Sequence, residues 1–273
     1  MNNSIGVMQG RLLPKYKGRY QAHPVKYWQK EFQIAQNIGL ECIEFILDYN
    51  DYEINPLLNK KGLNEIKSIY QKTGVAVKTI CADYFMESPL YLEDPIIFEK
   101  NQDVLLKLIN NSNEIGSTNI VIPCVDKSSL DSEFKINHFV KALQPAIDLC
   151  EIYQINLSLE TDLNPNSFIE LISKFQSNRI TVNYDIGNSA ALGFNPIEEL
   201  EAYGDRITDI HIKDRTLGGG SVVLGTGNAD FELFFNVLKN YDYKGPFIMQ
   251  AFRDDEGVEI CKQQLQWILP FIK

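Results

Sequence analysis

The stretch Asp209-Ile210-His211-Ile212-Lys213-Asp214-Arg215 alternates apolar and polar residues, and Gly218-Gly219-Gly220 follows it closely. This pattern predicts a short buried strand that runs into a loop. His211 lies near the carboxyl end of the strand, between two isoleucines, and the chain has only three histidines. A histidine followed directly by Lys213, Asp214 and Arg215 indicates a polar site at the strand end. The alternative is an imidazole that is simply hydrogen-bonded to a backbone carbonyl.

Strand patterns of this kind recur along the chain, each followed by a segment with helical periodicity, and the repeat of about 30 residues fits a barrel unit. We expect strands at 4–10, 42–48, 75–83, 119–124, 156–161, 180–187, 207–214 and 246–253. We expect helices at 25–39, 62–73, 96–115, 136–153, 166–175, 196–203, 231–240 and 258–271.

Strict alternation of strands and helices implies a parallel sheet with helices outside it. Eight units favour a closed (β/α)8 TIM barrel, which we expect residues 1–273 to form as a single domain. An open doubly wound sheet is not favoured, because no GxGxxG motif follows the first strand. The glycine-rich segment 218–227 lacks the GK[ST] of a phosphate-binding P-loop.

Composition narrows the functional classes. The formal net charge of -10 argues against a nucleic-acid-binding protein, which normally presents a basic face. None of the five cysteines falls in a CxxC pair, which favours a reducing compartment. We find no signal-peptide pattern and no apolar run of about 20 residues. The expectation is a cytoplasmic protein without a membrane partner.

Polar side chains stand at the predicted carboxyl ends of the last four strands. These residues are Glu160, Asp185, His211 and Gln250. The carboxyl ends of barrel strands converge on one face, so we expect the four side chains to meet. Two carboxylates, an imidazole and an amide oxygen suit a divalent cation such as Mn, Co, Mg or Zn. The alternative is that the carboxylates pair with lysines or arginines in the barrel mouth.

Several motifs resemble those of one known family. The chain carries GVMQGR at 6–11, SLET at 158–161, NYDIGN at 183–188, DIHIKDR at 209–215 and LGTGNADF at 224–231. In order and spacing they resemble the sugar phosphate isomerase/epimerase family, the xylose-isomerase-like barrels that also include endonuclease IV-type enzymes. The resemblance implies a metal-dependent isomerase or epimerase of a ketose or sugar phosphate. Such enzymes transfer a proton next to a carbonyl through an enediolate.

The resemblance also implies a ligand set, and this chain departs from it. Glu160, Asp185 and His211 match the family's metal ligands, but Gln250 stands where the pattern expects a glutamate. An amide gives the metal an oxygen but cannot take a proton, so a dehydratase (lyase) acting on a keto-polyol and a non-catalytic sugar-binding barrel remain open. A second departure is Asn188, where the family often has histidine. An endonuclease is not favoured, given three histidines and the acidic charge.

The catalytic assignment follows from these matches. We expect Glu160 to act as the base next to the carbonyl. For the second acid we favour Lys213 over Asp214, Glu44 and a metal-bound water. Residues that we expect to contact substrate are Gln9, Arg11, Glu44, Asp83, Asn188, Arg215 and Arg253, of which the last two suit a carboxylate or phosphate. The alternative for each is a packed or solvated loop side chain. We expect a small sugar ligand, and aromatic residues in the loops favour a homodimer.

Overall fold

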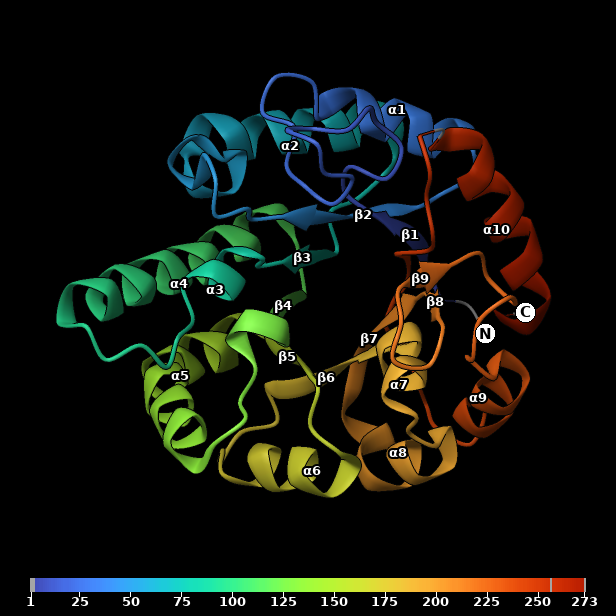
Figure 1. Cartoon of the computed structure of the whole chain (residues 1–273). Helices are drawn as coiled ribbons and strands as arrows, with labels where there is room; N and C mark the ends of the chain where they lie inside the picture. Colours follow the sequence, from blue (N-terminus) through green and yellow to red (C-terminus); the bar gives the residue numbers. More distant parts are fainter. Residues whose placement is uncertain (1–2, 256, 273) are drawn as a thin grey trace.

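The structure is a computed structural model that describes residues 3–255 and 257–272. Eight parallel strands close into a barrel in the order β1-β10-β7-β6-β5-β4-β3-β2, with helices around it (Figure 1). The barrel strands are β1 (Ile5–Met8), β2 (Cys42–Ile46), β3 (Thr79–Cys81), β4 (Asn119–Cys124), β5 (Asn156–Thr161), β6 (Ile180–Asp185), β7 (Ile207–Ile212) and β10 (Phe247–Met249). A two-stranded antiparallel sheet is added by β8 (Asp214–Arg215) and β9 (Ser221–Val222). The predicted TIM barrel is confirmed.

Ten helices occur in the described part of the chain. They are α1 (Gln29–Asn37), α2 (Lys60–Thr73), α3 (Tyr84–Glu87), α4 (Pro95–Ile115), α5 (Glu133–Tyr153), α6 (Pro165–Ser173), α7 (Ile186–Leu192), α8 (Pro196–Tyr203), α9 (Phe231–Leu238) and α10 (Val258–Ile272). Short 3-10 turns are η1 (Tyr52–Ile54), η2 (Pro56–Leu58), η3 (Asp126–Ser128) and η4 (Gly204–Arg206). None of the described helices combines the length and apolar character needed to cross a bilayer.

The sequence prediction differs from the structure mainly at element ends. The strand expected at 75–83 pairs regularly only over Thr79–Cys81. The strand expected to reach Gly187 stops at Asp185, because the Asp185 side chain accepts a hydrogen bond from the Asn188 N–H and thereby caps α7. The short helices α3 and α7 and the β8–β9 sheet have too few residues to give a readable periodicity.

The barrel interior contains a small apolar cluster and a separate group of hydroxyls. Side chains from β1 to β4 and β10 form a small apolar cluster of Met8, Cys42, Ile46, Cys81, Val121 and Ile248. On the other side, β5 to β7 contribute Ser158, Thr181 and Thr208, whose hydroxyls lie 2.6–3.0 Å from one another. The larger core lies between the strands and the helices. Burial of apolar surface stabilises the outer layer, whereas the three hydroxyls inside the barrel satisfy one another by hydrogen bonds.

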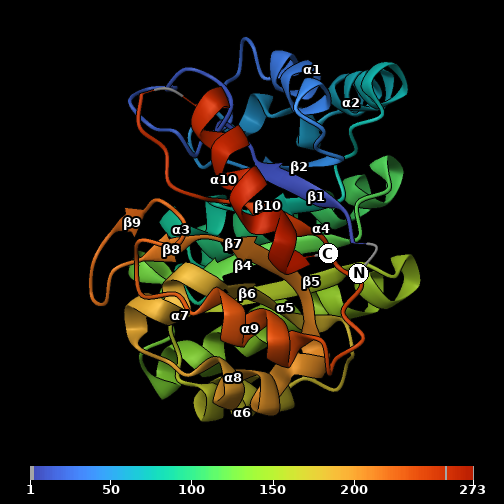
Figure 2. The same cartoon turned by 90° about the vertical axis from the view of Figure 1, so that its right-hand side faces the viewer.

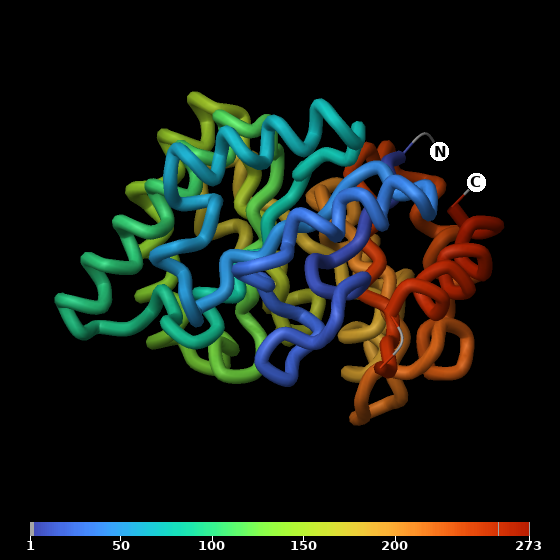
Figure 3. Tube along the Cα trace, turned by 90° about the horizontal axis from the view of Figure 1, so that it is seen from above, coloured from blue at the N-terminus to red at the C-terminus, as the bar shows by residue number. Residues whose placement is uncertain are grey.

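The carboxyl ends of the strands form one face of the molecule. The β8–β9 sheet lies on this face, on the opposite side of the barrel from the two chain ends (Figure 2). Seen from above, the loop after β1 and the loop after β7 lie along the same edge of the molecule (Figure 3). The functional residues predicted at the carboxyl ends of the strands therefore lie on this face.

Candidate metal centre and cavity

Three neighbouring strands bring Glu160, Asp185 and His211 together. Each offers a ligand atom, and these atoms lie within 4.8 Å of one another, at buried positions. Asp185 and His211 are direct partners in the register of β6 and β7. That register depends on an irregularity between Val182 and Asn183, which shifts the end of β6 against β7. The strand pairing itself therefore places the carboxylate beside the imidazole.

The two nitrogens of His211 face different partners. Nε2 lies 2.9 Å from Oε1 of Glu44 on β2, inside the barrel. Nδ1 lies 3.2 Å from Asn183 Nδ2, 3.9 Å from Asp185 Oδ2 and 4.0 Å from Glu160 Oε2. Burial alone would lower the pKa of His211, but Glu44 and Asp185 outweigh it and hold this pKa well above its usual range. Binding of a metal at Nδ1 requires loss of the proton there, and the carboxylate on Nε2 strengthens such a ligand.

The two carboxylates have different surroundings. Burial would raise the pKa of Asp185, but Lys213, whose Nζ lies 3.1 Å from Oδ2, and His211 hold it well below its usual range. Burial raises the pKa of Glu160 to about 7, although His211 opposes the shift. Glu160 accepts a hydrogen bond of 2.7 Å from the side chain of Asn188. The pairing of Asp185 with a lysine, the alternative to a metal ligand, is thus present in the structure.

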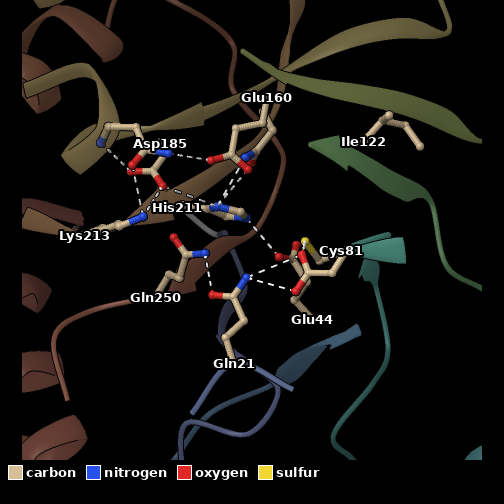
Figure 4. A network of polar contacts seen from close by, with 12 residues as sticks. Gln21, Glu44, Cys81, Ile122, Glu160, Asp185, His211, Lys213 and Gln250 are labelled. Atoms are coloured by element: carbon tan, nitrogen blue, oxygen red, sulfur yellow. Dashed lines mark hydrogen bonds and ion pairs between the residues drawn. The ribbon is translucent and has the colours of Figure 1, made fainter. Parts of the chain in front are cut away.

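Gln250 follows β10 and is the fourth predicted ligand. Its side chain is buried, and its Nε2 donates to Oε1 of Gln21 at 3.0 Å. Its Oε1 has no hydrogen-bond partner among the described residues, although it is buried. Figure 4 shows this oxygen turned toward the side of Asp185, Lys213 and His211. A buried acceptor without a partner, next to two carboxylates and an imidazole, fits a divalent cation.

A second group of acidic side chains lies deeper in the barrel. Glu44 and Asp209 also offer ligand atoms within 4.8 Å of His211. Here, however, the imidazole already bonds to Glu44, whose other oxygen accepts from the Thr79 hydroxyl. Burial raises the pKa of Asp209 well above its usual range. We therefore assign this group to the support of His211 rather than to a metal.

A cavity of about 440 Å³ opens above the centre. Its walls come from the loops after β3 to β7 and β10, together with Gln21 from the loop after β1. The residues that line it are Gln21, Asp83, Met86, Pro123, Val125, Asp126, Glu160, Thr161, Asp162, Asn188, Ala191, Leu192, Lys213, Arg215, Gly218 and Gln250. The volume suits a small polar molecule, and the lining is rich in hydrogen-bonding groups.

Asn188 connects several residues predicted for the site. Its Oδ1 accepts from Lys213 Nζ at 3.1 Å and from Arg215 Nη1 at 2.8 Å. Lys213 passes directly over α7, where a Cβ on Gly187 would come within 2.7 Å of the lysine Cγ. Glycine at position 187 is therefore needed for this close approach. Asp83, also predicted, lies on the opposite wall and accepts from Gln21.

Four residues predicted to contact substrate are not among those that line the cavity. Gln9 accepts from the Ile46 N–H, and Glu44 bonds to His211 inside the barrel. Arg11 donates to the Ala251 carbonyl and lies behind Gln21. Arg253 donates to the carbonyls of the loop after β1, at residues 10, 11 and 13. In the structure these side chains build the site's frame, and the two arginines hold backbone rather than an open anion position.

Sequence reasoning missed Gln21, which bridges Gln250 and Asp83 across the cavity floor. It lies in a long loop without periodicity, so no pattern marks it. Asp214 was considered as an acid, but it is buried and accepts from the N–H groups of Gly225, Gly227 and Ala229. Its role in the structure is to fold the glycine-rich loop beside Arg215.

Comparison with known proteins agrees with this fold. Residues 32–271 match the profile of the xylose isomerase-like TIM barrel family. The chain is 28% identical over 261 residues to the putative L-ribulose-5-phosphate 3-epimerase SgbU of Haemophilus influenzae, covering 89% of this chain and 90% of that protein. The D-allulose 3-epimerase from Methylomonas sp., solved in complex with D-allulose, superposes with a TM-score of 0.75 at 18% identity, over 97% of this chain and 96% of that one.

A further solved structure, the IolI protein with a bound zinc atom, superposes with a TM-score of 0.75 at 16% identity, over 97% of this chain and 98% of that one. At these identities the two structures support the fold. The family profile spans most of the chain, from α1 to α10. This protein belongs to the xylose isomerase-like TIM barrel family.

Proposed function

We propose that this protein is a divalent-metal-dependent isomerase or epimerase acting on a ketose or a ketose phosphate. One observation carries the proposal: Glu160, Asp185 and His211 converge with ligand atoms within 4.8 Å of one another, and Glu160 also lines an open cavity. The name of the SgbU relative, an L-ribulose-5-phosphate 3-epimerase, and the sugar bound to the D-allulose 3-epimerase support the substrate class.

Glu160, Asp185, His211 and Gln250 are the residues that would hold the cation. When bound, a divalent ion supplies electrophilic stabilisation of negative charge on the substrate oxygen. The identity of the ion depends on its affinity for the site and on its availability in the cell. A ligand set of three oxygens and one nitrogen suits Mn, Co or Mg, and Zn is a further candidate. The zinc in the IolI structure supports a metal at such a centre.

Glu160 is the base in this proposal. Its carboxylate lines the cavity, and Asn188 occupies only one of its oxygens, at 2.7 Å. Glu160 takes the proton from the carbon next to the carbonyl, which leaves an enediolate. Return of the proton to the same carbon from the other face inverts it, whereas return to the neighbouring carbon moves the carbonyl.

Lys213 is the proposed proton donor. Its ammonium group lines the cavity next to Asp185 and Asn188, and the residue directly follows β7, the strand adjacent to that of Asp185. A lysine held there donates a proton to the enediolate or to its oxygen, which the neutral amide of Gln250 cannot do. Arg215, Asn188 and Asp83 are the proposed contacts to substrate hydroxyls or to a phosphate.

Gln250 favours a second candidate, the dehydration of a keto-polyol. Elimination of water after proton abstraction needs one base at carbon and an acid at the leaving oxygen. A centre with one carboxylate base and one ammonium group satisfies that requirement without a second carboxylate. The two reactions share the first step and differ in the product.

A single assay distinguishes the candidates. The protein is incubated in deuterated water with each of Mn, Co, Mg and Zn and with a set of ketoses and ketose phosphates, and the mixture is followed by proton NMR. Isomerase or epimerase activity gives a new sugar with deuterium at the exchanged carbon. Loss of water from the sugar identifies the lyase. Absence of exchange with every metal and sugar, together with absence of metal binding, overturns the proposal.

We also propose that the protein works in the cytoplasm. All five cysteines are free thiols at buried positions. Unpaired, buried thiols support a reducing compartment.

A further inference from the structure

We propose that Gln21 is a positioning residue that, oriented by Asp83, fixes the amide of Gln250 with its oxygen toward the cation. The inference rests on the proposed metal centre and adds to it a relay of three side chains from three different loops. The relay is Asp83 after β3, Gln21 after β1 and Gln250 after β10, and Figure 4 shows the contact between Gln21 and Gln250.

Asp83 determines the direction of the relay. An ionised carboxylate only accepts hydrogen bonds, so its neighbours must present N–H, O–H or S–H groups to it. Gln21 meets this condition with Nε2, which lies 3.2 Å and 3.5 Å from the two oxygens of Asp83. The Cys81 thiol lies 3.1 Å from Oδ1 and supplies a further donor. The amide nitrogen of Gln21 is thereby held on the side of Asp83.

The amide oxygen of Gln21 must then face the other way. It accepts from Gln250 Nε2 at 3.0 Å and from Arg11 Nη2 at 3.4 Å. Arg11 is itself held by a 3.0 Å bond to the Ala251 carbonyl, one residue after Gln250. Two donors from different elements therefore meet the same oxygen, and both oppose rotation of the Gln21 amide by half a turn.

The orientation of Gln250 follows from that of Gln21. Because Nε2 of Gln250 is committed to Gln21, its Oε1 points away from the relay. This oxygen is buried and has no hydrogen-bond partner among the described residues. It is turned toward the side of Asp185 and His211 (Figure 4). An amide that rotated freely would present its N–H₂ to the cation for part of the time, and an N–H₂ group repels a cation.

The same relay explains why glutamine suits position 250. With a glutamate at position 250, Oε1 of Gln21 would face a carboxylate oxygen. Both groups accept hydrogen bonds, so they would repel each other. For Gln21 to turn its nitrogen toward that carboxylate, it would have to give up its bond to Asp83. Gln21 and Gln250 are in this sense a matched pair: Gln21, in the loop after β1, favours a neutral amide rather than a carboxylate at position 250.

The test is the affinity for Mn²⁺ alone, measured from the EPR signal of the free ion in titrations of the purified protein. Burial raises the pKa of Asp83 to about 6, so a buffer at pH 8 keeps this carboxyl ionised. We expect Gln21→Met to weaken Mn²⁺ binding about tenfold, as loss of a group that orients a ligand does. In a Gln250→Glu background the same substitution should cost nothing, because a carboxylate offers an oxygen in either orientation.

Asp83→Asn tests the direction of the relay. An asparagine amide can donate to Gln21 Oε1, which allows both glutamines to reverse, so we expect weaker Mn²⁺ binding in the wild-type background. Asp162→Asn is the matched control, because it removes a carboxylate that lines the same cavity without touching the relay. The loss with Asp83→Asn should exceed that with Asp162→Asn. In the Gln250→Glu background, a reversed Gln21 amide would donate from Nε2 to the carboxylate at position 250. Asp83→Asn should therefore not weaken Mn²⁺ binding in that background.

The outcomes separate the inference from the proposed function. If the wild-type protein binds no Mn²⁺, Co²⁺, Mg²⁺ or Zn²⁺, the proposed metal centre itself fails. If it binds Mn²⁺ but Gln21→Met has no effect, or has the same effect in both backgrounds, the relay is wrong and the metal centre stands. Circular dichroism of each variant identifies a loss caused by misfolding, and the double variants provide the comparison within a folded background.

Discussion

Nε2 of His211 lies 2.9 Å from Oε1 of Glu44, and both side chains are fully buried inside the barrel. This bond crosses the barrel from β7 to β2 and leaves Nδ1 facing Glu160 and Asp185, with the side-chain nitrogen of Asn183 at 3.2 Å. A carboxylate behind a histidine fixes the ring and makes it a stronger ligand. Glu44, which the sequence suggested as a substrate contact, therefore orients His211, a proposed metal ligand.

We expect Glu44→Gln to lower Mn²⁺ affinity at least about tenfold, because the charge behind the imidazole is lost. The measurement is a calorimetric titration with Mn²⁺. Glu199→Gln is a suitable control, since Glu199 is also buried but accepts from the hydroxyls of Tyr184 and Tyr203. Equal affinity in the Glu44 variant and in wild type would show that this bond does not support the metal centre.

Glu160→Gln and Lys213→Met should differ in what they abolish. Glu160→Gln removes the base and a charged ligand, so both Mn²⁺ affinity and deuterium exchange should fall. Lys213→Met leaves all four proposed ligands in place and frees Asp185 from its 3.1 Å ion pair. Its Mn²⁺ affinity should be kept or increased, while turnover falls by roughly 10²–10⁴-fold, the usual contribution of a general acid. Full turnover in Lys213→Met would exclude this lysine as the proton donor.

Asp214→Ala tests the glycine-rich loop beside Arg215. The Asp214 carboxylate accepts from three backbone N–H groups at 2.8–3.1 Å, and it is buried. Leaving these donors without an acceptor should lower the free energy of unfolding by about 2 kcal/mol. Urea denaturation measures the change, and limited proteolysis should cut within residues 216–227. Asp230→Ala, which removes only the cap of α9, is the control and should cost less.

Glu31, which is not a proposed metal ligand, should make the free energy of unfolding depend on pH. Burial raises its pKa from 4.5 to about 7 in the folded protein. Between these values the folded state binds more protons than the unfolded state, so stability is full below pH 4.5 and is lost as the pH rises through 7. The loss amounts to about 3 kcal/mol.

The comparison for this prediction is the free energy of unfolding of wild type minus that of Glu31→Gln, from urea denaturation at about pH 5 and pH 8. The Gln variant cannot ionise at this position. The free energy of unfolding of wild type, relative to that of Glu31→Gln, should therefore be lower at about pH 8 than at about pH 5. An unchanged difference would mean that Glu31 keeps an ordinary pKa.

The architecture was readable from the sequence because strand and helix periods alternate regularly over the whole chain. The positions of Glu160, Asp185 and His211 were readable for the same reason, since barrel topology places carboxyl strand ends on one face. The role of Asp214 was harder to predict, because a sequence does not distinguish a carboxylate that stabilises a loop from one that takes part in a reaction. The loop's many glycines were the only available signal.

The contacts that organise the site could not be predicted. Gln21 lies in a loop whose path depends on Glu31 and Gly10, and its partners come from the loops after β3 and β10. The buried bond between Glu44 and His211 joins residues 167 positions apart. Arg253 had the chemistry of a phosphate clamp, but its partners are backbone carbonyls. Such pairings depend on three-dimensional packing, which local patterns do not encode.

The most direct test of the central claim is a crystal structure of the protein soaked in Mn²⁺, with data collected for anomalous scattering. We predict one strong anomalous peak on the carboxyl face of the barrel, within coordination distance of Glu160, Asp185, His211 Nδ1 and Gln250 Oε1. A peak that none of these side chains coordinates, or no peak at a concentration at which calorimetry shows binding, would contradict the proposed metal centre.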